Sequence, residues 1–170
     1  MIPPDASDKP AAPQEIEIMT VWPSLAARPD GRFLGRMYRW NLGFRLLGIP
    51  ITIGRILALL TAPLVIPLFF ITLLPFSAQR YRLTNRRVVV QKGWRGEDER
   101  SVSLDRFDNI LIEVQPGQAW YHAGDLIFRL GQVETLRLQG VPRPETFRNT
   151  CLDAQRSHVG VQKALGTAMA

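Results

Sequence analysis

An uncharged run, residues 56–78, constrains this chain more than any other feature of its sequence. A helix needs roughly 20 apolar residues to cross about 30 Å of hydrocarbon, and the run is long enough. Pro63, Pro67 and Pro75 interrupt it. Because a proline removes a backbone donor and clashes with the preceding turn, these positions predict kinks. The run therefore predicts a kinked membrane helix.

The preceding stretch, residues 42–54, is also apolar and carries only Arg45 as a charge. It is too short for a second full crossing unless its ends snorkel, so a single span and a helical hairpin both stay open. Residues 32–45 and 80–95 are about equally basic. The positive-inside rule therefore does not orient a single span, whereas a hairpin satisfies it on both sides. We favour the hairpin.

The charge pattern bears on the choice between lipid and nucleic acid. A net charge of +6 and a pI of about 10.2 would suit a nucleic-acid-binding protein. However, no acidic residue lies between Asp30 and Glu97, and the bases in that interval mostly flank the apolar run. This arrangement is typical of a segment held at an anionic cytoplasmic leaflet. We expect a lipid bilayer as partner and no nucleic acid. The alternative is a soluble nucleic-acid-binding domain that hides residues 46–76 in its own core or in an oligomer interface.

Residues 31–44 predict an amphipathic helix that leads into the membrane segment. Two kinds of side chain recur there at helical spacing: the bases Arg32, Arg36 and Arg39, and the apolar Phe33, Met37 and Trp40. A basic helix with tryptophan suits the membrane interface. The side chains expected at that interface are Arg36, Arg39, Trp40 and Arg45. A soluble helix with one solvated face is the alternative.

After Ser77 the sequence changes to short runs rich in Val, Ile, Leu and Arg, which predict a small antiparallel β domain. The expected strands are residues 79–84, 86–92, 100–104, 109–114, 125–130 and 133–139. Period-two alternation predicts these core side chains: Ile110, Ile112, Val114, Leu126, Phe128, Leu130, Leu136 and Leu138. A terminal helix should follow Pro142 and Pro144, with an apolar face formed by Phe147, Cys151 and Ala154.

The run Arg80-Tyr81-Arg82-Leu83-Thr84-Asn85-Arg86-Arg87-Val88 resembles the "YxLTxxR" opening of the bacterial PH-like membrane proteins, the YdbS-like family. Trp22-Pro23-Ser24 resembles the short "PS" motif of that family. The resemblance covers about residues 21–157. It implies an α+β fold: a membrane helix or helical hairpin, then a PH-like antiparallel β-barrel or sandwich capped by a C-terminal α-helix. Since the family usually has seven strands, we expect a further strand near residues 120–122.

Four segments follow from these features. We expect residues 1–20, rich in Pro, Ala and Asp, to be disordered. Residues 21–78 hold the lead-in and transmembrane segment, residues 79–157 the PH-like domain, and residues 158–170 a flexible tail. Cys151 is the sole cysteine and forms no intrachain disulfide, so we expect the domain on the cytoplasmic side of the bacterial cell membrane.

Catalytic and cofactor chemistry find little support in the sequence. His122 and His158 lack cysteine or carboxylate companions at metal-ligand spacing. No phosphate-binding loop of the Walker or dinucleotide type is present. Tyr121, His122 and Asp125 lie close in sequence, and we interpret them as loop residues. We therefore expect a non-enzymatic protein without cofactor, metal or small-molecule substrate.

The predicted functional residues are bases on the first hairpin of the β domain. The expected contacts to lipid headgroups are Arg82, Arg86, Arg87, Lys92 and Arg95. Alternatively, these bases are solvated strand residues that only set the membrane topology. The resulting hypothesis is a membrane-anchored interaction or scaffold module whose partner is the bilayer, a membrane protein or a second copy of the chain. An accessory subunit of a membrane enzyme or transporter is the other function left open.

Overall fold

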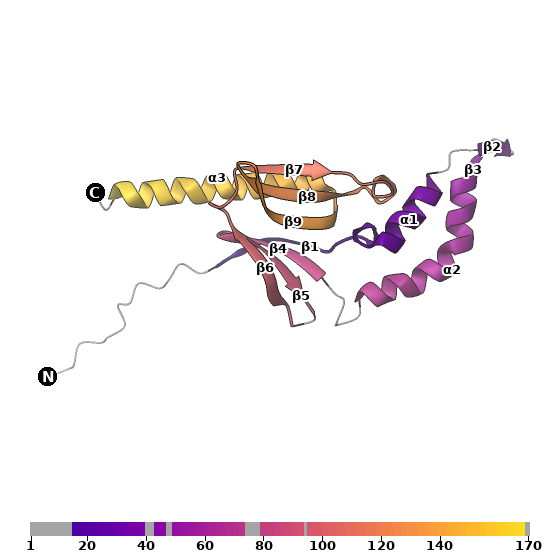
Figure 1. Ribbon diagram of the computed structural model, residues 1–170, viewed down its shortest axis with the longest axis horizontal. Coiled ribbons are helices and arrows are strands. Elements are labelled where there is room, and N and C mark those ends of the chain that lie inside the picture. Colours follow the sequence, from indigo (N-terminus) through magenta and orange to yellow (C-terminus); the bar gives the residue numbers. More distant parts are fainter. Residues whose placement is uncertain (1–14, 40–42, 47–48, 74–78, 94, 169–170) are drawn as a thin grey trace.

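The computed structural model describes residues 15–39, 43–46, 49–73, 79–93 and 95–168 of the chain. It has two antiparallel sheets and a long C-terminal helix (Figure 1). The first sheet has the order β1-β4-β5-β6, with strands Glu17–Val21, Gln79–Thr84, Arg87–Lys92 and Glu97–Ser103. The second has the order β7-β8-β9, with strands Asn109–Glu113, Ala123–Leu130 and Val133–Pro142. Helix α3 is Pro144–Ala168.

The α+β class is confirmed. Of the two expected forms, barrel or sandwich, the barrel is wrong, because the sheets do not close. The two sheets are separate hydrogen-bonded units rather than one continuous ladder. Their inner faces and α3 share one hydrophobic core, in which Phe107 and Phe128 meet edge to face with ring centroids 5.0 Å apart. The protein therefore closes its core with the helix instead of with further strand pairing.

The seventh strand lies elsewhere than expected. Residues Ala119–Tyr121 form a short 3-10 helix, η2, whereas the additional strand is β1, which pairs antiparallel with β4. Residues 17–20, which we expected to be disordered, are part of β1. At the other end, α3 continues to Ala168 through the segment that we expected to be a flexible tail. The division into four segments otherwise stays a prediction.

Most of the predicted core is confirmed. The buried side chains include Ile110, Leu126, Phe128, Leu136, Leu138, Phe147, Cys151 and Ala154. Ile112 is partly buried against this core. The prediction that Val114 and Leu130 lie in the core was wrong, because these side chains are 52% and 49% exposed. Val114 follows the end of β7 and Leu130 is the last residue of β8, so both lie where the sheet no longer covers the core.

A long insertion between β1 and β4 carries the segment that we expected in the membrane. Its elements are η1 (Leu25–Ala27), α1 (Pro29–Tyr38), β2 (Gly43–Leu46), β3 (Ile49–Thr52) and α2 (Ile53–Leu73). The predicted lead-in helix is thus shorter than residues 31–44. The favoured helical hairpin is wrong, since β2 and β3 pair antiparallel where its first helix was expected. Pro50, together with the β-branched Ile49 and Ile51, favours strand over helix there.

Helix α2 is a single helix that contains Pro63 and Pro67. Figure 1 shows it bent in its middle, as prolines inside a helix predict, with α1 on the inner side of the bend. The hydroxyls of Tyr38 in α1 and Thr61 in α2 lie 2.6 Å apart and share a hydrogen bond. Within the described part of the chain, no helix combines the length and the apolar character that a membrane crossing requires.

The buried thiol of Cys151 gives a first prediction. Burial raises its pKa from 9.0 to about 12, so at pH 9 the folded chain should be alkylated by iodoacetamide about 100-fold or more slowly than the urea-unfolded chain. Folding favours the protonated form, hence this stabilisation is complete below about pH 9 and is lost as the pH rises toward 12. Mass spectrometry of the alkylated protein measures the rate.

The control for this prediction uses the same helix. In a Cys151→Ala background, Ser157→Cys places a thiol at an exposed position of α3. That thiol should react at nearly the same rate in the folded and the unfolded chain. Equal rates for folded and unfolded Cys151 would contradict the buried placement of the thiol.

Candidate functional site

Two residues of the "YxLTxxR" motif have structural roles. The Tyr81 hydroxyl donates to the Gln139 carbonyl oxygen (2.9 Å), and the Gln139 amide approaches the same hydroxyl at 3.2 Å, so Tyr81 links β4 to β9. The Thr84 hydroxyl accepts a hydrogen bond from the Arg87 amide at 3.1 Å, which closes the turn between β4 and β5. The motif therefore stabilises the hairpin and its packing on the second sheet.

The predicted headgroup contacts fall into two groups, of which the first lies toward the turn between β4 and β5. Arg82 forms an ion pair with Glu17 of β1 (2.8 Å), and Arg87 forms ion pairs with Glu15 (2.8 Å) and Asp98 (3.3 Å). The hydrogen bond from Arg87 lowers the pKa of Glu15. Neighbouring acids thus offset much of the charge of Arg82 and Arg87.

Arg86 lies in the turn itself and is exposed. The second group, Lys92 and Arg95, lies at the opposite end of the hairpin and is also exposed. Lys92 is paired with Gln79, the first residue of β4 after the α2 segment. Strand β5 has six residues, so about 20 Å of strand separates Lys92 from Arg86.

The residues predicted at the membrane interface lie on or just after α1. Arg36 is exposed, and its guanidinium carbon lies 5.9 Å from the ring centroid of Phe33. Arg39 is exposed at the C-terminal end of α1. Trp40 lies outside the described residues. Arg45 belongs to β2, but its side chain is outside the described part.

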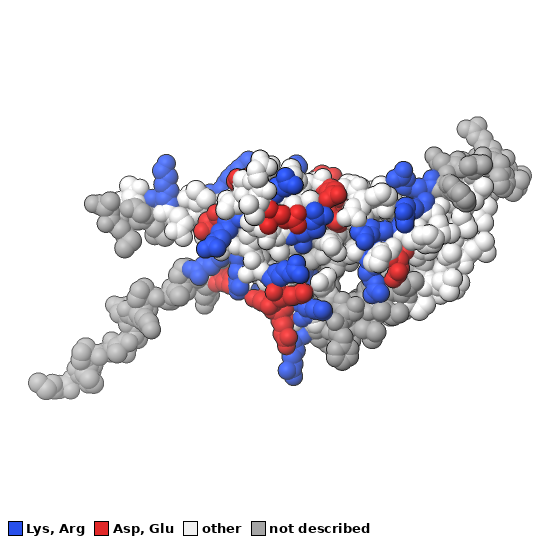
Figure 2. All heavy atoms as spheres, in the orientation of Figure 1, with Lys and Arg blue, Asp and Glu red and all other residues white. Residues whose placement is uncertain are grey.

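The outer side of α2 is an exposed apolar surface in the described part of the chain. The exposed large apolar side chains are Ile56 (39%), Leu59 (77%), Leu60 (68%), Leu64 (65%), Ile66 (56%) and Phe70 (62%). In the view of Figure 2 the visible part of this helix is uncharged, and bases lie next to it over α1. Arg55, in the first turn of α2, is exposed as well. Soluble monomers rarely leave so large an apolar patch in water, so this surface indicates an interaction.

A buried polar cluster holds the insertion against the β domain. Asp125 is fully buried. Its carboxylate accepts hydrogen bonds from the Gln118 side chain (2.6 Å), the Gln115 side chain (2.7 Å) and the Gly140 amide (2.9 Å). Arg32 of α1 in turn donates to Gln115. This cluster joins α1, the loop between β7 and β8, and β9.

The sequence did not reveal the role of Asp125, which we had interpreted as a loop residue. Two glutamines three positions apart and an aspartate ten positions after the first were the only local signal, and such a pattern is common in surface loops. The burial of the carboxylate depends on Gly140 and on α1, both distant in sequence. Only tertiary contacts place these groups together.

Backbone contact adds to this attachment. A Cβ atom at Gly35 of α1 would lie 2.1 Å from the carbonyl oxygen of Gly117. Gly117 has a φ of 98°, a conformation that favours glycine. The two glycines thus let α1 lie directly on the loop between β7 and β8.

We expect Gly35→Ala to destabilise the protein by about 1–3 kcal/mol, because the added methyl group has no space. Thermal unfolding of the full chain in detergent measures the loss. The matched control is Gly160→Ala in α3, where a Cβ meets no atom within 4 Å. That variant should be unchanged or slightly more stable, since alanine favours helix. Equal unfolding temperatures for both variants would contradict the close contact.

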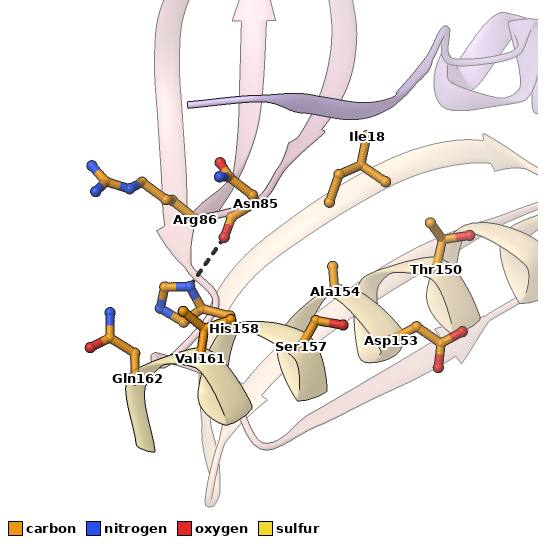
Figure 3. A pocket seen from close by; sticks show the side chains of 10 residues that line it. All are labelled: Ile18, Asn85, Arg86, Thr150, Asp153, Ala154, Ser157, His158, Val161 and Gln162. Carbon is orange, nitrogen blue, oxygen red and sulfur yellow. Dashed lines mark hydrogen bonds between the residues drawn. The ribbon is translucent and has the colours of Figure 1, made fainter. Parts of the chain in front are cut away.

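A groove lies at the end of the molecule farther from α2. Its lining residues are Ile18, Asn85, Arg86, Thr150, Asp153, Ala154, Ser157, His158, Val161 and Gln162 (Figure 3). The volume is about 450 Å³. His158 Nδ1 is hydrogen bonded to the Asn85 carbonyl oxygen at 3.1 Å, which ties α3 to the turn that contains Arg86. Apolar side chains and both signs of charge line this groove, so its chemistry suits a protein segment better than a single ion.

Residues 39–155 match the family described as "Bacterial PH domain". The chain belongs to this family. Domains of the PH type are generally interaction modules without catalytic activity, which agrees with the role suggested by the sequence. No curated protein and no solved structure matches the chain. Among the described residues of this bacterial PH domain, no three His, Cys, Asp or Glu side chains are grouped so that they would hold a metal ion.

Proposed function

We propose that this bacterial PH domain is a non-enzymatic interaction or scaffold module, held at the cytoplasmic face of the bacterial cell membrane by α2. The observation that carries the proposal is the exposed apolar outer side of α2, with Leu59, Leu60 and Leu64 at its centre. Burying one such leucine in an apolar environment contributes about 1.5–3 kcal/mol. The bases on α1 would meet anionic headgroups beside it.

The packing of α1 supports one orientation of α2 toward lipid. Tyr38 binds Thr61 on the inner side of the bend, so the bilayer would contact the outer side. In this arrangement Arg36, Arg39, Lys92 and Arg95 contact headgroups. Contact by Arg82, Arg86 and Arg87 stays a prediction that requires the β domain to lie along the membrane surface, because these residues are nearer the other end of the hairpin.

The groove beside α3 supports the scaffold part of the proposal. Figure 1 shows the C-terminal end of α3 and α2 at opposite ends of the long axis of the molecule. A domain anchored through α2 would therefore present this groove to the cytoplasm. A protein partner, either a second copy of the chain or a membrane protein with a cytoplasmic segment, would bind on that side.

Fractionation of cells that produce the full chain tests this function. We expect the protein in the membrane pellet after a carbonate wash, because apolar contacts persist when ionic ones are weakened. In the Cys151→Ala, Ser157→Cys variant, a membrane-impermeant maleimide should label the protein only after the cells are opened. Recovery of the chain in the carbonate supernatant would refute anchoring through α2. Labelling in intact cells would refute the cytoplasmic orientation.

A further inference from the structure

The outer edge of β7 is a surface that the proposed function leaves unused. Strand β7 is the outermost strand of the second sheet, and within the described residues β8 is the strand that pairs with it (Figure 1). All pairs between these strands, from Asn109–Arg129 to Glu113–Asp125, follow one register without a bulge. A regular edge strand exposes a row of backbone donors and acceptors that a further strand can bind.

The other edge strands of the two domain sheets are protected against such pairing. Strand β6 carries a row of exposed charged residues, 97–100, and the register of β1 with β4 is irregular. Strand β9 is covered by the segment before η1, where the Ser24 amide donates to the Gly140 carbonyl oxygen at 2.9 Å. Charges, bulges and covering segments are means by which proteins block edge strands. Strand β7 lacks these protections, and Leu111 at its centre is 37% exposed.

The sequence of β7 is complementary to itself in an antiparallel pair. Two copies related by a two-fold axis through Leu111 would pair over the whole strand, with Leu111 opposite itself and Asn109 opposite Glu113 of the second copy. Residues directly opposite each other share a face of the sheet, so the buried Ile110 would lie opposite the half-buried Ile112. An axis through any other residue of β7 would leave part of the strand unpaired.

Arg129 supplies a charged contact for this pair. Its Nε atom is buried and has no hydrogen-bond partner among the described residues. Glu134, opposite Arg129 on β9, forms its ion pair with Arg137 instead (3.0 Å). On the other side Arg129 is opposite Asn109, which in the two-fold pair lies beside Glu113 of the second copy. About 10 Å would separate the Cα atoms of Arg129 and that Glu113, a distance that two long side chains span.

We propose that β7 binds β7 of a second copy of the chain, antiparallel and centred on Leu111, so that the two second sheets form one continuous sheet. The Leu111 side chains would cover each other, and an Arg129–Glu113 contact would lie on each side of them. Self-complementarity favours a second copy over a foreign segment, because β7 itself offers the apolar centre and the acidic end that its own edge requires. The contact is independent of what covers α2, and the groove beside α3 contains no residue of β7.

Disulfide trapping in the full chain tests the pairing. In a Cys151→Ala background, Leu111→Cys would bring two thiols opposite each other, with Cα atoms about 4.5–5.5 Å apart. The control is Ser101→Cys, which places an exposed thiol on the edge strand β6. In detergent with copper phenanthroline, Leu111→Cys should form the covalent dimer at least about tenfold faster than Ser101→Cys, because the proposed pair meets the distance range of a disulfide.

Two further cysteine variants test the register in the same background. Asn109→Cys alone and Glu113→Cys alone keep like thiols about 13 Å apart along the strands, so neither should cross-link with itself. An equal mixture of the two variants should cross-link, because Asn109 lies opposite Glu113 of the second copy. Self-cross-linking of Asn109→Cys at the rate of Leu111→Cys would overturn the proposed register.

Size-exclusion chromatography with light scattering, in the same detergent, measures the dimer without cross-linking. Leu111→Lys places two like charges opposite each other and should weaken the dimer about fivefold or more. The matched control, Val133→Lys, adds the same charge at a 67% exposed position at the start of β9 and should leave the dimer unchanged. The proposal is overturned if the unmodified chain is monomeric, if Leu111→Lys dimerises equally well, or if Leu111→Cys cross-links no faster than Ser101→Cys.

Discussion

Replacing Asp125 with alanine is expected to destabilise this bacterial PH domain by about 2–6 kcal/mol, because it leaves two buried hydrogen-bond donors without their acceptor. The carboxylate is fully buried and receives three hydrogen bonds between 2.6 and 2.9 Å. Alanine would leave the Gln118 side chain and the Gly140 amide without this acceptor. Each unsatisfied buried donor costs about 1–3 kcal/mol. Urea unfolding of the full chain in detergent measures the loss.

Two further variants make this prediction specific. Asp125→Asn keeps the shape of the side chain and one acceptor oxygen. Its free energy of unfolding should therefore fall less than that of Asp125→Ala. Asp153→Ala removes a carboxylate from an exposed position of α3 and should change the free energy of unfolding by less than about 0.5 kcal/mol. If Asp125→Ala and Asp153→Ala unfold at the same urea concentration, the buried cluster does not hold α1 and the loop in place.

The strands of the β domain could be predicted from the sequence because their signals are local. Strand β4 has the bounds expected from the pattern, and the turn after it contains the polar Asn85. Strand β1 gave no comparable signal. It is short, and its partner β4 follows only after an insertion of more than fifty residues, as the pairing of Val21 with Tyr81 shows. Its role becomes evident only when the sheet is formed.

The separation of β1 from β4 in the sequence also explains what was missed at the candidate site. Glu15 and Glu17 neutralise Arg87 and Arg82, but this pairing follows from the position of β1 and could not be read from the basic run alone. The apolar character of residues 42–54 likewise does not distinguish a membrane helix from the β2–β3 hairpin. Apolar composition predicts burial in some medium, whereas backbone hydrogen bonding decides which element forms.

Helix α2 is where the sequence and the structure bear most directly on the proposed function. The sequence indicates an apolar helix, and the structure shows which side of it is exposed. A change that adds charge there without disturbing the packing of α1 separates lipid binding from stability.

We expect Leu60→Asp with Leu64→Asp to lower binding of the full chain to phosphatidylglycerol vesicles by at least about 100-fold in flotation. Each leucine side chain removed from an apolar environment loses about 1.5–3 kcal/mol of binding free energy, and the two added carboxylates would have to leave water as well. Both leucines are more than 60% exposed, so thermal unfolding should change little. The matched control, Leu130→Asp with Val133→Asp, adds the same charge at exposed positions (49% and 67%) at the end of β8 and the start of β9. It should float like the unmodified chain; equal flotation of both double variants would mean that α2 is not the anchor.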